Sequence, residues 1–221
     1  MTSAPGSRDI RAANPAFRDR LRAAAEAAQI ALDLGEIIQL EQYFALLARW
    51  NPTINLTSLA LDPLSDATIS RLLIEPLQVA CRIENAPLRW FDLGSGGGSP
   101  AIPLKIVRPL PTLTMVESRS RKAAFLSEVA RFLDLTDVIV LLTRIEAIEN
   151  SESRDALDLV TMQAVRTDER LLRVVSALLV KGGRLCLFGA SSGRAYRVGL
   201  EQVDRIQFVG GGSSAEIFRK T

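Results

Sequence analysis

The chain has 221 residues, of which 48% are hydrophobic and 24% charged, a balance typical of a globular protein with a substantial core. Its formal net charge of +2 is too small to indicate nucleic-acid binding by bulk charge, so any such site must be a local basic patch. The sequence contains no histidine, which excludes the most common general base, the most common zinc ligand and every Ser-His or Cys-His nucleophile pair.

The first segment, residues 1–20, is rich in Pro, Gly, Ser and Arg, and we expect a poorly ordered lead-in there. It lacks the apolar core of a signal peptide, and no apolar run of the chain reaches transmembrane length, so we expect a cytoplasmic protein. Cys81 and Cys186 lie far apart without metal-ligand spacing. We expect two reduced core cysteines and no metal site.

Three helices are predicted next. Residues 21–31 are alanine-rich and helix-prone, and the apolar residues of 37–47 recur at steps of three and four. The second helix should stop at Trp50-Asn51-Pro52, because proline disfavours helix in the residue before it. Residues 66–83 are helical in pattern, and Pro76 should end or kink that helix. These helices predict an N-terminal helical region that is packed on the rest of the chain.

Beyond this region, short apolar runs alternate with amphipathic segments, which is typical of an α/β fold with a parallel sheet. We therefore divide the chain into the lead-in, a helical region over 21–86 and a Rossmann-like domain over 87–221. The predicted strands are 89–93, 112–117, 137–142, 157–162, 183–188, 203–209 and 214–219. The predicted helices are 100–107, 121–134, 168–180 and a weaker one at 193–201.

The most informative segment is WFDLGSGGG at 90–98, an apolar strand that leads into a glycine-rich turn. Such a turn brings backbone N–H groups close to a ligand, and Pro100 suits the start of the following helix. Glu117 ends the second strand 23 residues beyond Gly94, where an acidic residue can accept hydrogen bonds from ribose hydroxyls. Nicotinamide dinucleotides and S-adenosylmethionine both suit this geometry.

The C-terminal third favours S-adenosylmethionine. The segment LLVKGGRLCLF at 178–188 resembles the entry to the fifth strand of methyltransferases that use this cofactor. The last two strands can pair as a hairpin, as the antiparallel final strand of that fold requires. A dinucleotide-dependent oxidoreductase would more often carry a second domain, for which little chain remains.

Three motifs carry a more specific resemblance: ARWNPTINLTS at 48–58, FDLGSGGGSPAIPLKIVRP at 91–109 and VESRSRKAAFLSEVARFLDL at 116–135. In order and spacing they resemble the glucose-inhibited division protein B family, from about residue 30 to the end. The resemblance implies a class I S-adenosylmethionine-dependent methyltransferase fold. It also implies transfer of a methyl group to a guanine N7 of small-subunit (16S) ribosomal RNA by direct in-line attack, with the RNA or the small subunit as partner.

The family's site residues can be transferred to matching positions of this sequence. The resemblance places the cofactor at a set of residues from the glycine turn and the strand ends, namely Gly94, Ser95, Gly96, Ser99, Glu117, Ile145, Glu146 and Gln163. The RNA-binding candidates are Asn55 and Arg71 from the helical region and, independently of the family, the basic cluster Arg119, Arg121 and Lys122, for which a solvated helix face is the alternative. Guanine N7 bears no proton, so the reaction needs no general base and suits a chain without histidine. We expect a monomer.

Several positions depart from the family pattern. Where the family has arginine and lysine after the fourth and fifth strands, this chain has Gln163 and Phe188, and Leu72 replaces a common histidine. Gln163 and nearby Arg166 are the candidates for a catalytic role. The losses leave open a weakened or retargeted cofactor-binding relative, or an assembly factor without activity.

Overall fold

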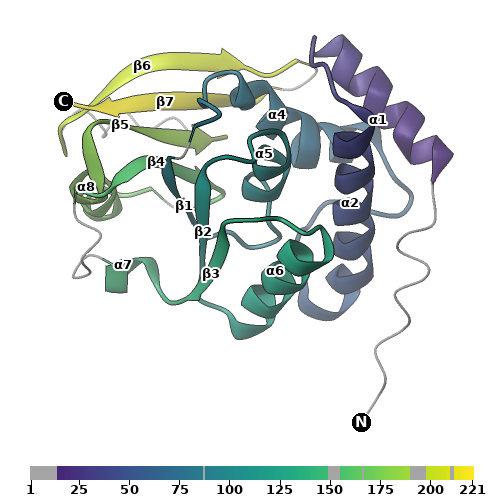
Figure 1. The fold of residues 1–221 in the computed structure, drawn as a ribbon, viewed down its shortest axis with the longest axis horizontal. Helices are drawn as coiled ribbons and strands as arrows, with labels where there is room; N and C mark the ends of the chain where they lie inside the picture. Colours follow the sequence, from purple (N-terminus) through teal and green to yellow (C-terminus); the bar gives the residue numbers. More distant parts are fainter. Residues whose placement is uncertain (1–13, 87, 149–154, 166, 190–197, 210–211) are drawn as a thin grey trace.

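The computed structural model describes residues 14–221 except 87, 149–154, 166, 190–197 and 210–211 (Figure 1). Helix α1 spans Pro15–Ala27 and begins at Asn14, whose side chain accepts a hydrogen bond from the Phe17 backbone N–H. The predicted lead-in over 1–20 is therefore wrong for its last residues. The apolar residues Phe17, Leu21 and Ala25 recur at four-residue steps and bury one face, which stabilises an earlier helix than composition alone predicts.

Helix α2 spans Leu34–Ile54 and passes through Pro52, so the predicted stop at residues 50–52 is wrong. Proline removes one intrahelical hydrogen bond, but only close to the end of a long helix whose inner face is buried. The helix ends instead at Asn55, which adopts a left-handed backbone with φ 49°. The Asn51 side chain accepts hydrogen bonds from the N–H groups of Leu56 and Thr57, which fixes the exit of the chain.

The third predicted helix consists of three parts: α3 (Asp66–Ile69), a π-helical turn η2 (Ser70–Ile74) and α4 (Glu75–Ala80). The irregular turn ends two residues before Pro76, close to the predicted kink. Cys81 follows α4 and is exposed, so the expectation that it lies in the core is wrong, whereas Cys186 is buried.

The sheet has seven strands in the order β3-β2-β1-β4-β5-β7-β6. The strands are β1 (Arg89–Leu93), β2 (Thr112–Glu117), β3 (Val138–Leu142), β4 (Leu157–Gln163), β5 (Leu179–Phe188), β6 (Leu200–Gln207) and β7 (Ser214–Lys220). The first five are parallel, and β7 pairs antiparallel with both β5 and β6, which confirms the predicted C-terminal hairpin.

Several predicted elements differ at their ends, and the strand predicted at 203–209 is β6, which starts and ends earlier, at Leu200–Gln207. Strand β5 starts at Leu179 rather than 183, because the chain stays extended through the Lys-Gly-Gly segment, with Gly182 at φ +83° and an irregular register opposite β4. The weaker helix predicted at 193–201 falls largely outside the described residues. Its last residues are wrong, because Leu200 already begins β6.

Helices cover both faces of the sheet (Figure 1). On one face, α5 (Ala101–Val107) and α6 (Ser120–Phe132) share a core with the N-terminal helices, so the helical region and the sheet pack directly together. On the other face, α8 (Glu169–Leu178) and the short α7 (Ile145–Ile148) pack on a second core. None of the described helices is both long and apolar enough to cross a membrane.

Candidate functional site

The glycine turn after β1 is tied to the end of β2. The N–H groups of Gly94 and Ser95 both donate to the Val116 carbonyl, at 2.9 and 3.1 Å. Gly94 has φ +77°, and a Cβ atom there would lie 2.8 Å from Val165 Cγ2. Position 94 therefore needs glycine both for its backbone and for the space that its neighbour occupies.

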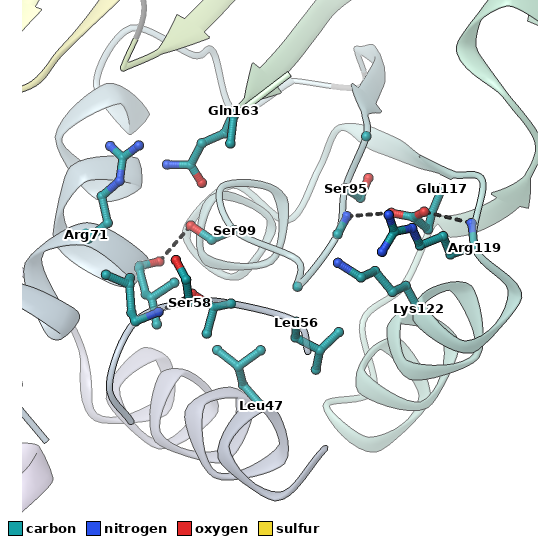
Figure 2. Close-up of a pocket in the computed structure, with 17 residues that line it drawn as sticks. Leu47, Leu56, Ser58, Arg71, Ser95, Ser99, Glu117, Arg119, Lys122 and Gln163 are labelled. Atoms are coloured by element: carbon teal, nitrogen blue, oxygen red, sulfur yellow. Dashed lines mark hydrogen bonds between the residues drawn. The ribbon is translucent and has the colours of Figure 1, made fainter. Parts of the chain in front are cut away.

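A cavity of about 430 Å³ opens between this turn, the strand ends and the N-terminal helices (Figure 2). This volume lies within the range of small-molecule sites, and the carboxyl ends of parallel strands are where such sheets bind ligands. Its lining residues are Leu47, Leu56, Thr57, Ser58, Leu59, Arg71, Leu72, Gly94, Ser95, Gly96, Gly97, Ser99, Glu117, Arg119, Lys122, Gln163 and Ala164.

Glu117 is buried at the end of β2 with 7% of its surface exposed. Its Oε2 accepts a hydrogen bond from the Gly96 N–H at 3.0 Å, and its Oε1 accepts one from the Arg119 N–H at 2.8 Å (Figure 2). Each carboxylate oxygen has two lone pairs, so each retains an acceptor site for a ligand hydroxyl. The carboxylate is thus held in place by the loop and remains able to bind a diol.

The end of α2 and the segment after it cover the glycine turn. The buried Tyr43 hydroxyl donates to the Gly97 carbonyl at 2.8 Å. A Cβ atom on Gly97 would lie 3.1 Å from the Leu56 carbonyl oxygen and 3.3 Å from Leu47 Cδ1. Helix α2 therefore packs directly on the turn, and its apolar side chains supply one wall of the cavity.

Cationic side chains lie at two parts of the cavity. Arg119 and Lys122 lie beside Glu117 at the start of α6 (Figure 2). On the opposite side, Arg71 forms an ion pair with Glu75, whose side chain is only 5% exposed. Glu75 also accepts a hydrogen bond from the Ser213 hydroxyl at 2.9 Å, so the carboxylate that anchors Arg71 is itself anchored to the segment before β7.

Gln163 ends β4 and points into the space near Arg71 (Figure 2). Its Nε2 atom is buried and has no hydrogen-bond partner among the described residues. Buried amide donors are normally paired, and an unpaired one costs about 1–3 kcal/mol. Gln163 is therefore a side chain whose hydrogen-bonding capacity a ligand could complete.

Behind the turn lies a second buried carboxylate, Asp92, on β1. Its Oδ1 accepts a hydrogen bond from the Thr161 hydroxyl at 2.5 Å, and that hydroxyl accepts one from Trp90 Nε1 at 2.9 Å. Burial raises the pKa of Asp92 to about 6, and the hydrogen bond from Thr161 to its carboxylate only partly opposes this shift. Asp92 does not line the cavity and supports the turn from behind.

Most of the predicted cofactor residues lie around this one cavity, namely Gly94, Ser95, Gly96, Ser99, Glu117 and Gln163. Ile145 and Glu146 do not line it: they lie in α7, where Ile145 packs against the second core. Of the predicted RNA-binding residues, Arg71, Arg119 and Lys122 line the cavity, whereas Asn55 and Arg121 do not. Arg166 lies outside the described residues.

Phe188 is not a cavity residue. It is 2% exposed and its ring stacks on Phe208 with a centroid distance of 6.2 Å. The interpretation of Phe188 as a lost pocket cation is therefore corrected: its side chain belongs to the core. Leu72, in contrast, does line the cavity.

The predicted site residues leave out part of the lining, namely Leu47, Leu56, Thr57, Ser58, Leu59 and Ala164, whereas Gly97 lies in the predicted turn over 95–99. For the segment Leu56–Ser58 a signal was present, because it lies within the motif at 48–58 that carries the family resemblance. The other positions have no chemical signature, since they line the cavity only through the packing of α2 and the turn after β4.

Comparisons with known proteins agree with this architecture. A family model described as rRNA small subunit methyltransferase G, GidB, matches residues 36–202. A ribosomal RNA small subunit methyltransferase G from Chloroflexus aggregans is 40% identical over 157 residues, which cover 71% of this chain and 65% of that protein. One from a Roseiflexus species is 38% identical over 148 residues, covering 66% of this chain and 62% of that protein. The chain thus matches slightly less than two thirds of the length of these relatives.

Among solved structures, a SAM-dependent methyltransferase from Aquifex aeolicus is similar in fold, with a TM-score of 0.54 and 14% identity. The similarity covers 72% of this chain and 95% of that one. Together with the observed strand order, it confirms the predicted Rossmann-like class I methyltransferase fold.

Proposed function

Because the chain belongs to the GidB family of rRNA small subunit methyltransferases G, we propose that it methylates guanine N7 in small-subunit (16S) ribosomal RNA with S-adenosylmethionine as cofactor. The observation that carries this proposal is the cavity at the strand ends, where the glycine turn, Glu117 and a set of cations lie together. In the same proposal the protein acts as a monomer in the cytoplasm, where its RNA substrate is made.

The residues of the cavity fit this cofactor. Glu117 has free acceptor sites for the two ribose hydroxyls, and at Gly96 a Cβ position with no neighbour closer than 3.7 Å leaves room beside the backbone for the methionine portion. Leu47 and Leu56 offer apolar surface on the other side. We propose no adenine contact for Ile145 and Glu146, because neither lines the cavity.

When bound, S-adenosylmethionine supplies an electrophilic methyl group on a sulfonium. The chain's own residues then have to bind the RNA, orient the guanine and exclude water, because N7 carries no proton to remove. Arg71, Arg119 and Lys122 would contact the phosphates or guanine O6, and this cationic environment would orient the base without proton transfer. A chain without histidine is chemically sufficient for this task.

Incubation of small-subunit ribosomal RNA, or of assembled small subunits, with the protein and methyl-labelled cofactor tests the proposal. We expect the label on a guanine, as 7-methylguanine after digestion. A folded protein that binds S-adenosylmethionine but transfers no label to either substrate would overturn it.

Gln163 favours one alternative, a weakened or retargeted relative that still binds the cofactor. The position has an amide where the family pattern has a cation, and its Nε2 lacks a partner among the residues that the structure describes. If this alternative holds, Gln163→Arg should raise methyl transfer to ribosomal RNA about tenfold, because a charged hydrogen bond contributes about 1.5–3 kcal/mol. Transfer by the original protein at a rate that Gln163→Arg does not improve would exclude it.

A further inference from the structure

The π-helical turn η2 meets the glycine loop close to Pro76, which supplies no backbone donor to the helix. In the π-helical register of this turn, where the Glu75 N–H donates to the Ser70 carbonyl, residue 76 would donate to the Arg71 carbonyl, and in an α-helical register it would donate to the Leu72 carbonyl. That residue is proline, which has no N–H. A buried carbonyl without a donor is unfavourable, so a donor from elsewhere stabilises this segment.

Ser99 supplies this donor from the glycine loop. Its hydroxyl donates to the Leu72 carbonyl oxygen at 3.0 Å, and Figure 2 shows this bond at the edge of the cavity that Ser99 lines. The bond joins two segments that are 27 residues apart in the sequence. It gives Ser99 a role different from the cofactor contact that the family resemblance implies.

The same turn carries Arg71, the cation on this side of the cavity. Its guanidinium is held by Glu75, and a Cβ atom on Gly189 would lie only 3.0 Å from its Nη2 atom. The backbone next to Arg71 is held at Leu72 by Ser99. The guanidinium of Arg71 is therefore held by Glu75, and the backbone next to Arg71 is held by the glycine loop.

We propose that Ser99 is a positioning residue whose hydroxyl replaces the donor that Pro76 lacks, so that the glycine loop fixes the turn that presents Arg71 to the substrate. This bond connects the loop that would hold the cofactor to the backbone next to Arg71, the cation that would hold the RNA. The part of the inference that concerns RNA rests on the proposed function, whereas the part that concerns the hydrogen bond does not.

Thermal unfolding of four variants without any ligand tests the bond. Ser99→Ala should lower Tm by about 2–4 °C, the shift that the loss of about 1 kcal/mol produces in a chain of this size. Pro76→Ala restores a backbone N–H that can bond to Leu72. In that background Ser99→Ala should lower Tm by less than about 1 °C. Ser99→Thr keeps the hydroxyl and should stay close to the original Tm.

The matched control is Ser127→Ala, which removes a hydroxyl that donates to the Ala123 carbonyl within α6. Its effect on Tm should be the same with and without Pro76→Ala. Equal losses of Tm from Ser99→Ala in both backgrounds would overturn the proposed exchange of donors.

Binding of an in vitro transcript of small-subunit ribosomal RNA, measured without cofactor, tests the positioning of Arg71. Ser99→Ala should weaken binding about threefold to tenfold in the original chain and should not weaken it further in an Arg71→Gln background. Ser127→Ala should leave binding unchanged. An equal loss in both backgrounds would mean that Ser99 does not act through Arg71. If the original chain binds no RNA at all, the proposed function fails, while the unfolding measurements still decide on the bond.

Discussion

At the residue scale, Gly94 and Gly182 differ in why they are glycine: both have a strained backbone, but only Gly94 also has a close neighbour. Gly94 and Gly182 have nearly the same φ, +77° and +83°, but only Gly94 has a neighbour that a Cβ atom would overlap. At Gly182 nothing lies within 4 Å of that position. A side chain at either residue strains the backbone by about 1–2 kcal/mol, and the overlap with Val165 adds about 1–3 kcal/mol.

We therefore expect Gly182→Ala to lower the free energy of unfolding by about 1–2 kcal/mol, and Gly94→Ala by about 2–5 kcal/mol. Cofactor affinity should fall at least about tenfold for Gly94→Ala only, because a shifted turn no longer fits a ligand beside its backbone. Urea unfolding and calorimetry measure the two quantities. Equal losses of stability in both variants would contradict the importance of Val165.

Glu117 has both a structural and a binding task, and Glu117→Gln affects both. An amide has one acceptor oxygen, so either the Gly96 or the Arg119 N–H loses its partner. We expect a loss of about 1–3 kcal/mol in the free energy of unfolding, and a cofactor affinity that is about tenfold to a hundredfold lower. Calorimetry at a temperature well below Tm measures the affinity. An unchanged affinity would mean that Glu117 serves the loop alone.

For the variant Phe188→Lys, the structure and the family pattern predict opposite effects. The family pattern predicts that Phe188→Lys restores a cation at the site, but the structure buries this side chain against Phe208. A buried unpaired ammonium is strongly unfavourable, and the lost ring adds about 3–5 kcal/mol. We expect a protein that is unfolded or severely destabilised in thermal unfolding. A stable and more active Phe188→Lys variant would show that the side chain turns to the cavity.

At the element scale, the sequence predicts the strands better than the helix ends. The bounds of β1 and β2 match the prediction, because each is a short apolar run with clear turn residues after it. The end of α2 does not match, because proline is only one local signal and the buried face of a long helix outweighs it. The π-helical turn could not be predicted, since the contact of its Leu72 carbonyl with the Ser99 hydroxyl joins segments 27 residues apart in the sequence.

The candidate site also has parts that the sequence predicts and parts that it does not. The glycine turn and Glu117 could be predicted because their chemistry depends on residue type and on the end of a strand. The burial of Phe188 and the distance of α7 from the cavity depend on which face of an element turns inward. A single sequence does not contain that information where both faces are apolar.

Helix α2 supports the glycine turn through one hydroxyl, and Tyr43→Phe tests this support. The Tyr43 hydroxyl is buried and donates to the Gly97 carbonyl, so its removal leaves that carbonyl without this donor. We expect a loss of about 1–2 kcal/mol in the free energy of unfolding and a weaker cofactor affinity, by about twofold to fivefold. Urea unfolding and calorimetry measure these changes. A loss of stability with unchanged affinity would mean that α2 stabilises the fold without shaping the site.

At the scale of the whole molecule, the site lies where the helical layer meets the carboxyl ends of the strands. The helical layer and the strand ends each contribute one wall of the cavity. Behind the glycine turn lies the buried carboxylate of Asp92 on β1. Asp92 has a raised pKa because burial disfavours its charged form, so the charge that it carries at neutral pH opposes folding. The stability of the molecule should therefore depend on pH through this residue.

The sign follows from proton binding. With a pKa of about 6 in the folded state and an ordinary value of 3.8, Asp92 binds more protons folded than unfolded between these values. Its contribution should lower stability as pH rises from about 4 to about 6, by roughly 3 kcal/mol at most, and should stay constant above. Asp92→Asn removes this dependence while its Oδ1 can still accept from Thr161. Urea unfolding from pH 4 to 7.5 should thus show a free-energy difference between Asp92→Asn and the original chain that changes in favour of the variant as pH rises.

Thr161→Val removes the hydrogen bond that stabilises the charged carboxylate, so the pH range over which stability falls should extend to higher pH. Parallel pH profiles of the original chain and Asp92→Asn would mean that Asp92 keeps an ordinary pKa in the folded protein.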